Sequence, residues 1–341
     1  MKRNFVYTSK IGIRMAIASQ MRCRGTRPFS SSLTAPHRHE SQPWRCFATT
    51  SQHHQDKPSP NAVGLPRETA FGGKRFADFD LAGKTFIVTG GARGLGLALA
   101  EALVEAGGRV YCLDRAESPD EEWDEALQRV VPEWGGSLEY RQVDVQDTEN
   151  LEQVIDQIAK ENNRLNGVIA AAGINQVTPA TKYEPEDANE MLKTNYTAVL
   201  MTATISARKM MEYKCHGSIC LIASMSGLIA NKGMKSPVYN SSKAAVLQLT
   251  RSLAMEWSKV KKDGSGGIRV NSLSPGHIMT PMVQKILDED PETEELWCKE
   301  NMMGRLAQTS EFKGAALFLL SNASSFMTGS NLVVDGGHTA W

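Results

Sequence analysis

The chain has 341 residues with 38 lysines and arginines against 38 aspartates and glutamates, so its formal net charge is zero at neutral pH. This balance creates no net field toward nucleic acid or an anionic membrane, and we expect small-molecule partners. No apolar run approaches the roughly 20 residues of a membrane span. The six cysteines have neither C-x-x-C spacing nor the density of a disulfide scaffold, which predicts free thiols.

The first 47 residues differ in composition from the rest. Eight lysines and arginines precede Glu40, with no aspartate or glutamate among them. This pattern is typical of a mitochondrial transit peptide, so we expect a targeting segment at 1–47 and the matrix as destination; the alternative is a disordered basic tail on a cytoplasmic protein. Residues 48–75 are rich in proline, glycine and histidine and predict a disordered linker. A single domain is then expected over 76–341.

A glycine-rich turn follows the first predicted strand, residues 85–89, and precedes an apolar helical run. Gly90, Gly94 and Gly96 allow, respectively, the turn, the close approach of a pyrophosphate and the packing of helix on strand. Exposed N–H groups at a helix start favour such an anion. Arg93 and Leu95 belong to the same turn and complete the candidate cofactor contacts here. A glycine-rich loop without a ligand is the alternative for a lone match.

A second strand at 109–113 ends at Asp114, about 20 residues beyond the glycine turn. A carboxylate there accepts hydrogen bonds from the ribose hydroxyls of NAD and repels the 2′-phosphate of NADP. Asp114 therefore predicts NAD as cofactor. NADP is the alternative, because Arg93 and Arg115 offer positive charge to a phosphate.

Further strands and helices alternate along the chain, with strands at 138–143 and 167–172 and a helix at 147–162 between them. This alternation predicts an α/β fold with a parallel sheet covered on both faces. Ligands then bind beyond the carboxyl ends of the strands. Further candidate cofactor contacts at these ends are Asp144, Val145, Ala172 and Gly173.

Three side chains carry the candidate chemistry. Ser224 ends a buried strand at 217–223, and Tyr239 and Lys243 stand four residues apart in a predicted helix, so both project from one face. An ammonium beside a phenol favours the phenolate, so we expect Lys243 to lower the pKa of Tyr239. Each residue has a structural alternative, since Ser224 could cap a turn. No metal site is predicted.

Taken in order, these motifs resemble the short-chain dehydrogenase/reductase family. Residues 89–96 match its T-G-x-x-x-G-x-G turn, and Ser224, Tyr239 and Lys243 match its serine and its Y-x-x-x-K motif. Asn195 matches the asparagine of its tetrad. The segment expected to cup the nicotinamide contains Pro275, Gly276, Ile278 and Thr280.

The resemblance implies a Rossmann-type, doubly wound sheet of seven parallel strands, with a dinucleotide half at 81–180 and a catalytic half at 181–341. It implies that Tyr239 exchanges a proton with the substrate oxygen during hydride transfer and that Lys243 also holds the nicotinamide ribose. Ser224 would orient the substrate, and Asn195 would position a water that links Lys243 to solvent. One departure is visible: the family's Asn-Asn-Ala-Gly is Ala-Ala-Ala-Gly at 170–173, which removes two side-chain amides from this segment.

The substrate is less clearly encoded. Residues 277–309 lack strong periodicity and are expected to form a mobile cover. Polar candidates suited to a hydroxylated substrate are Asn175, Gln176, Ser226, Asn231 and His277. The sequence also resembles fungal polyol dehydrogenases. The alternatives are a 3-oxoacyl thioester reductase and a nucleotide-binding protein without catalytic activity. The family resemblance further implies a homodimer or homotetramer built on helices near 189–211 and 238–259.

Overall fold

The computed structural model describes residues 76–341 of the chain. The predicted targeting segment at 1–47 and the predicted linker at 48–75 lie outside these residues. Within the described part the four cysteines, Cys112, Cys215, Cys220 and Cys298, are free thiols. No described helix is long and apolar enough to cross a bilayer.

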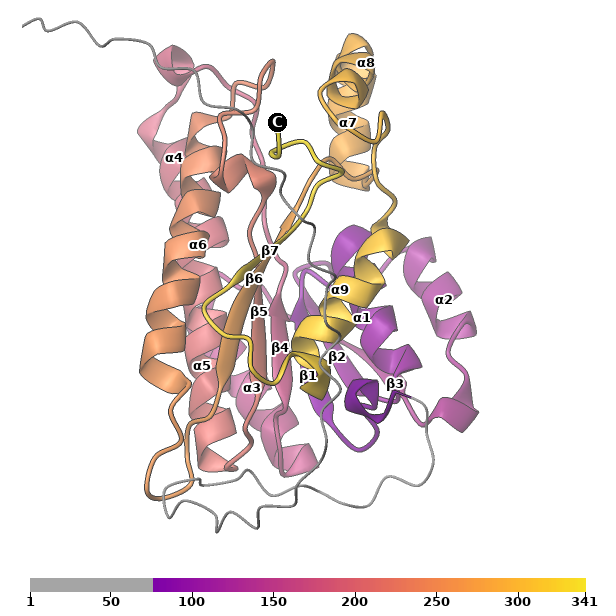
Figure 1. Ribbon diagram of the computed structural model, residues 1–341, viewed down its shortest axis with the longest axis vertical. Coiled ribbons are helices and arrows are strands. Elements are labelled where there is room, and N and C mark those ends of the chain that lie inside the picture. Colours follow the sequence, from indigo (N-terminus) through magenta and orange to yellow (C-terminus); the bar gives the residue numbers. More distant parts are fainter. Residues whose placement is uncertain (1–75) are drawn as a thin grey trace, which may run out of the picture. The chain divides into compact units, whose positions relative to one another are not determined.

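A seven-stranded sheet forms the centre of residues 76–341 (Figure 1). The strand order is β3-β2-β1-β4-β5-β6-β7 and every pairing is parallel. The strands are β1 (Thr85–Thr89), β2 (Arg109–Asp114), β3 (Ser137–Gln142), β4 (Gly167–Ala170), β5 (Ser218–Ile222), β6 (Arg269–Pro275) and β7 (Asn331–Val334). The predicted doubly wound, seven-stranded parallel fold is confirmed.

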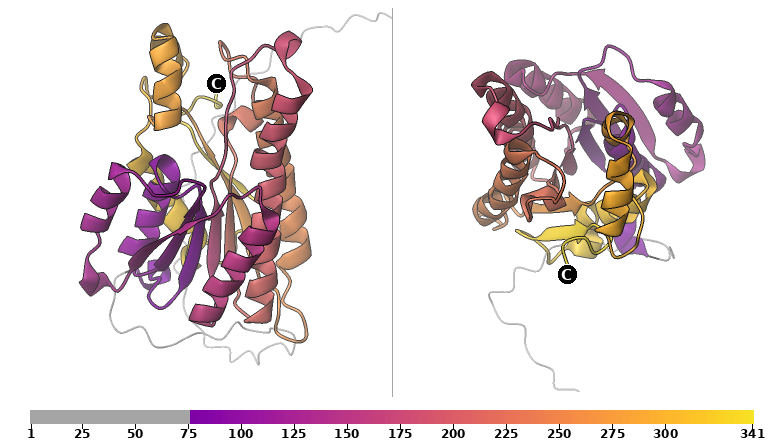
Figure 2. Two further views of the ribbon diagram at one scale, coloured as in Figure 1. Left: turned by 180° about the vertical axis from the view of Figure 1, so that it is seen from behind. Right: turned by 90° about the horizontal axis from the view of Figure 1, so that it is seen from above.

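Helices cover both faces of the sheet, as the views from behind and above show (Figure 2). The helices are α1 (Gly94–Glu105), α2 (Glu121–Gln128), α3 (Thr148–Asn162), α4 (Pro185–Leu192), α5 (Ala198–Glu212), α6 (Pro237–Trp257), α7 (Pro281–Glu289), α8 (Glu292–Lys299) and α9 (Lys313–Leu320). Successive residues of β1 point to opposite faces. Ile87 packs in the core formed with α3, α5 and α6, whereas Phe86 and Val88 pack in the core formed with α1 and α9. This two-sided burial explains the continuous apolar runs of the central strands.

The strand order reverses direction between β1 and β4. The chain runs outward from β1 to β2 and β3, then returns to β4 on the other side of β1. The loops that leave the carboxyl ends of β1 and β4 therefore diverge, and the crevice between them is where parallel α/β sheets bind ligands. This reversal positions the site described below.

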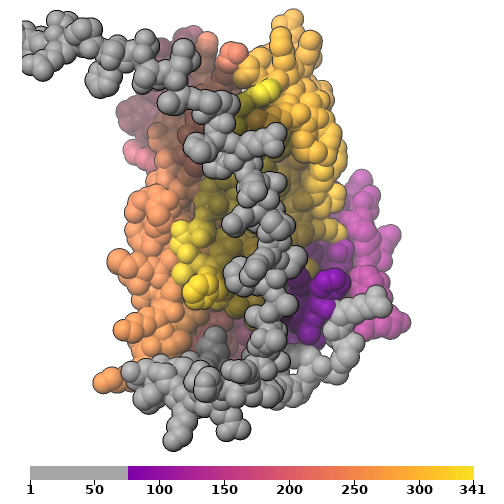
Figure 3. Space-filling view, in the orientation of Figure 1, coloured from indigo at the N-terminus to yellow at the C-terminus, as the bar shows by residue number. Residues whose placement is uncertain are grey.

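The segment 277–309, which lacks strong periodicity in the sequence and is predicted to form a mobile cover, contains two short helices, α7 and α8. Helices of nine and eight residues are too short to show a clear apolar period in the sequence. They enclose a small apolar core of Leu287, Trp297 and Leu306, against which Met234 and Met279 pack. In the space-filling view the carboxyl-terminal residues, coloured yellow, lie between α6 and the α7–α8 region (Figure 3).

Candidate active site

One cavity of about 540 Å³ runs along the carboxyl ends of the strands. It brings together sixteen of the eighteen predicted cofactor-binding and catalytic residues, from Gly90 at the first strand to Thr280 at the start of α7. These sixteen are Gly90, Arg93, Leu95, Gly96, Asp114, Asp144, Val145, Ala172, Gly173, Ser224, Tyr239, Lys243, Pro275, Gly276, Ile278 and Thr280. The predicted residues Gly94 and Asn195 do not line the cavity.

The glycine-rich turn has the geometry of a phosphate-binding turn. Gly90 has a φ of 68°, and a Cβ there would lie 2.7 Å from Cα of Ala172. A Cβ on Gly96 would overlap the carbonyl of Gly90, so this glycine lets α1 start directly against the turn. Gly94 has a φ of 58°, its N–H donates to Glu122 Oε2 at 2.7 Å, and a Cβ on it would lie 3.5 Å from Cδ of Pro281 and 3.9 Å from Cβ of Thr280, two residues that line the cavity. The role of Gly94 in the close approach of a pyrophosphate stays a prediction.

Asp114 ends β2 and lines the cavity together with Arg93 and Arg115. Its two carboxylate oxygens accept hydrogen bonds from the backbone N–H groups of Ala92, at 3.2 Å, and Arg115, at 2.8 Å. These contacts fix the carboxylate next to the glycine turn. A long cavity with a glycine turn at one end and a fixed carboxylate beside it fits a dinucleotide with free ribose hydroxyls.

Ala170 and Ala171 replace the family's two asparagines, and bonds to Thr89 hold the backbone of this segment in place. The N–H groups of Ala171 and Ala172 donate to the carbonyl and the hydroxyl of Thr89, at 3.2 and 3.4 Å. A Cβ on Gly173 would lie 3.3 Å from Asn195 Oδ1 and 3.6 Å from Lys243 Nζ. The backbone of 171–173 thus remains available for the cofactor without the two amides.

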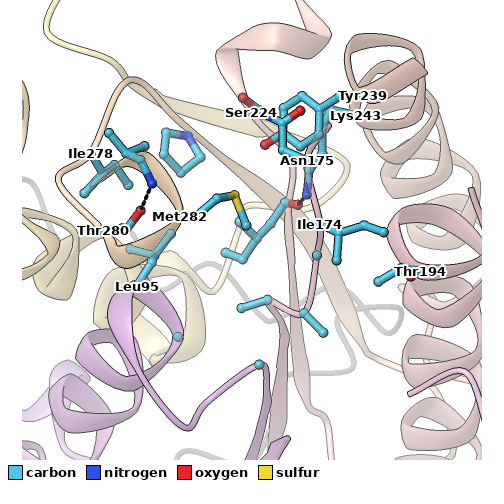
Figure 4. Close-up of a pocket in the computed structure, with 18 of the residues that line it drawn as sticks. Leu95, Ile174, Asn175, Thr194, Ser224, Tyr239, Lys243, Ile278, Thr280 and Met282 are labelled. Atoms are coloured by element: carbon cyan, nitrogen blue, oxygen red, sulfur yellow. Dashed lines mark hydrogen bonds between the residues drawn. The ribbon is translucent and has the colours of Figure 1, made fainter. Parts of the chain in front are cut away.

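Ser224, Tyr239 and Lys243 meet at the other end of the cavity (Figure 4). Ser224 follows β5, and its hydroxyl accepts from the Ser226 N–H at 3.1 Å, so it caps a turn as well as facing the cavity. Lys243 Nζ lies 5.7 Å from the centre of the Tyr239 ring and donates to the carbonyl of Ile222 at 2.8 Å. The predicted catalytic side chains other than Asn195 therefore share one wall.

Burial controls the charge of this pair. Burial raises the pKa of Tyr239 above its usual value near 10, against a smaller lowering by a hydrogen bond with Ser224. Burial also lowers the pKa of Lys243 to about 8. The expected lowering of the Tyr239 pKa by Lys243 is thus wrong for this structure, because desolvation outweighs other effects and the amine is bound to a carbonyl rather than to the phenol. A neutral phenol is suited to donate a proton to a ketone oxygen.

Asn195 lies in a π-helical segment, Lys193–Thr197, between α4 and α5. It is fully buried, and its amide bonds both backbone groups of Ile174, accepting from N–H and donating to C=O at 2.9 Å each. It also donates to Ser242 Oγ at 3.1 Å. Asn195 therefore braces the loop after β4, next to the cavity lining residue Ile174.

The substrate end of the cavity is partly polar. Asn175, Ser226 and His277 line it, whereas Gln176 and Asn231 do not and bond instead to Asp187 and Ser226. The lining residues that sequence reasoning did not name include Thr194, Met234 and Trp297. No local motif marks them, because tertiary packing alone brings them to the cavity. Thr194 was adjacent to a predicted site residue, which is the only local signal among them.

Contacts join the loop before α6 to the segment around α8, each of which contributes one residue to the cavity lining, Met234 and Trp297. Lys232 Nζ, in the loop before α6, lies 2.7 Å from Glu300 Oε1 just after α8. A Cβ on neighbouring Gly233, whose φ is 84°, would lie 2.5 Å from Leu296 of α8. The loop that precedes α6 is therefore in contact with helix α8.

Comparisons with known proteins agree with this geometry. The family model described as enoyl-(acyl carrier protein) reductase matches residues 90–339. A short-chain dehydrogenase/reductase of Aspergillus versicolor is 40% identical over 268 residues, covering 77% of this chain and 89% of the relative. The ribulose-forming D-arabinitol 2-dehydrogenase of Candida albicans is 34% identical over 277 residues, covering 77% and 95%.

The fold is also similar to that of a solved structure. The gluconate 5-dehydrogenase of Burkholderia cenocepacia, in complex with NADP and tartrate, superposes with a TM-score of 0.68 at 31% identity. The match covers 77% of this chain and 98% of that protein. The similarity spans the folded domain and not only the glycine turn.

Proposed function

The chain belongs to the short-chain dehydrogenase/reductase family, and on that basis we propose that it interconverts a polyol and a ketose with NAD as the preferred cofactor. Hydride transfer between NAD(P) and a secondary alcohol or ketone is the reaction of this family as seen in its relatives. The observation that supports it most is that one cavity joins Tyr239, Ser224 and Lys243 to the glycine turn and Asp114.

Some of the cavity residues bind the substrate or the cofactor, and others transfer the proton. The nicotinamide, when bound, supplies or accepts the hydride. In reduction Tyr239 donates its proton to the ketone oxygen, and in oxidation its phenolate takes the alcohol proton. Ser224, in contact with Tyr239, orients the substrate oxygen. Lys243 is buried beside the phenol. Its ammonium can bind a ribose hydroxyl and, after reduction, can supply a proton to the Tyr239 phenolate. Asn195 holds the Ile174 backbone and, by family resemblance, a water that links Lys243 to solvent.

A polyol or ketose fits the substrate end better than a 3-oxoacyl thioester. Asn175, Ser226 and His277 present amide, hydroxyl and imidazole groups to it. The relatives named for a polyol or a sugar acid support the same choice. A nucleotide-binding protein without activity is disfavoured because all four residues of the family tetrad are present.

The cofactor preference follows from Asp114. Its fixed carboxylate accepts ribose hydroxyls and repels a 2′-phosphate, which favours NAD. NADP use remains the alternative, since Arg93 and Arg115 line the same end of the cavity.

We also propose a mitochondrial matrix location, based on residues 1–47, and a homodimer or homotetramer. Met255 on α6 is 78% exposed, and an apolar side chain on an outer helix is suited to a contact between copies of the chain. Light scattering of the purified protein tests the assembly, with a monomer as the contradicting result.

The mitochondrial location is tested with a fluorescent protein that carries residues 1–47 at its amino terminus. Diffuse cytoplasmic fluorescence contradicts the location.

The function is tested by a substrate panel with purified protein. The panel contains pentitols and hexitols, the corresponding ketoses, butane-2,3-diol and 3-oxoacyl thioesters, each with NAD(H) and NADP(H). We expect the largest kcat/KM for a polyol or ketose with NAD(H). Turnover of thioesters alone assigns the chain to the reductase alternative, and NADH binding without turnover on the panel assigns it to the non-catalytic alternative.

A further inference from the structure

His277 directly follows Gly276 after the end of β6 and lines the substrate end of the cavity. The residue is 8% exposed, so more than nine-tenths of its surface is buried. It comes from a different element than Tyr239, which lies on α6. A substrate held at Tyr239 therefore lies in a cavity that His277 also bounds.

The His277 ring is held from two sides. Trp297 of α8 stacks on it, with ring centres 3.9 Å apart and planes 6° from parallel. His338, near the carboxyl terminus, meets it edge-on at 5.5 Å and 90°. The backbone is fixed too, because the His277 carbonyl accepts from the Ala307 N–H at 2.9 Å. This side chain is therefore preorganised.

The hydrogen-bonding capacity of the ring is not used within the described part of the chain. Nε2 of His277 is buried and has no hydrogen-bond partner among residues 76–341. Burial, and the nearby His338, lower the pKa of His277 to about 3, so the ring is neutral at physiological pH and carries one donor and one acceptor nitrogen. A buried polar atom without a partner is costly, and a ligand hydroxyl that bonds it recovers that cost.

We propose that His277 is a specificity-determining residue that hydrogen-bonds a substrate hydroxyl away from the reacting carbon. This inference rests on the proposed polyol function and adds to it the residue that binds the polyol hydroxyls away from the reacting carbon. The competing explanation is an enclosed water shared with His338, whose Nδ1 is also buried without a partner among residues 76–341. In that case His277 contributes to stability and not to the choice of substrate.

The experiment compares two substrates that differ in distal hydroxyls: the best polyol of the panel and butane-2,3-diol. His277→Phe keeps a flat ring for the Trp297 stack and removes both nitrogens. His216→Phe is the matched control, because His216 lies before β5 and contacts the carbonyl of Gly264, away from the cavity lining. We measure kcat/KM for both substrates, NADH affinity by fluorescence, and the melting temperature.

We expect His277→Phe to lower kcat/KM for the polyol by roughly 10- to 100-fold, the range for leaving a substrate hydroxyl without its partner. The value for butane-2,3-diol and the NADH affinity should stay within about threefold, and His216→Phe should match the wild type. An equal loss on both substrates, or a loss of stability alone, overturns the proposal in favour of the enclosed water.

The outcome separates this inference from the proposed function. A wild-type enzyme that does not prefer the polyol over butane-2,3-diol contradicts the polyol function itself. A wild-type preference that survives in His277→Phe contradicts only the role of His277. The pair His277→Gln and His277→Leu repeats the test without relying on the Phe variant to fold: Gln should keep more of the preference than Leu, and equal values contradict the proposal.

Discussion

The bracing role of Asn195 gives a stability prediction that can be worked out from its contacts. Asn195→Ala removes two hydrogen bonds to the Ile174 backbone and one to Ser242. Losing the partner of a buried polar group costs about 1 to 3 kcal/mol. Ile174 is only partly buried, so water can replace some of the loss, and we expect a total of about 2 to 4 kcal/mol. For a domain of this size that lowers the melting temperature by roughly 4 to 16 °C.

Thermal unfolding followed by circular dichroism measures the effect. Ser206→Ala in α5 is the matched control, because Ser206 is fully buried and its hydroxyl has no partner among residues 76–341. Removing that hydroxyl should be neutral or stabilising. Equal melting temperatures for Asn195→Ala and wild type, or an equal decrease in both variants, would refute the bracing argument.

Three further predictions concern the cavity. Tyr239→Phe should reduce turnover by about 10² to 10⁴ while NADH binding persists, and wild-type turnover contradicts its role. Lys243→Met should abolish turnover yet unfold at no lower temperature at pH 7, because a buried ammonium with a folded pKa of about 8 costs roughly 3 kcal/mol. Between pH 8 and 10.5 the folded wild type holds fewer protons than the unfolded chain, so its stability should rise with pH across that window. Any stability advantage of Lys243→Met over the wild type should therefore shrink as the pH rises. A variant that is less stable than the wild type at both ends of the window contradicts this. Asp114→Ser should lower the NAD to NADP efficiency ratio at least tenfold, and an unchanged ratio refutes the ribose assignment.

The sheet was largely predictable because its signals are local. The predicted strand at 138–143 is observed as Ser137–Gln142, and the predicted helix at 147–162 as Thr148–Asn162. Asp147 caps that helix, accepting from the Asn150 N–H at 3.1 Å. Apolar alternation, a cap residue and a glycine turn are each set by neighbours in sequence, so they can be read without knowing the tertiary structure.

The features that sequence analysis missed depend on burial and on contacts across the fold. The spacing of Tyr239 and Lys243 correctly placed both in one wall, but their pKa shifts depend on how deeply the cavity buries them. The two short helices of 277–309 are defined by the apolar core around Trp297 rather than by a sequence period. A π-helical segment at Asn195 likewise has no local signature here.

Asn195 shows why a motif position does not by itself establish a chemical role. It bonds Ile174, whose neighbours line the cavity, so any substitution that breaks this brace also moves the cavity wall. A loss of activity in Asn195→Ala is then expected whether or not the residue positions a water for Lys243. The two roles separate in the pH profile: a proton relay shifts the pH dependence of kcat, whereas a displaced wall lowers kcat at every pH. The kinetic pKa, and not the size of the activity loss, is therefore the measurement that assigns the relay.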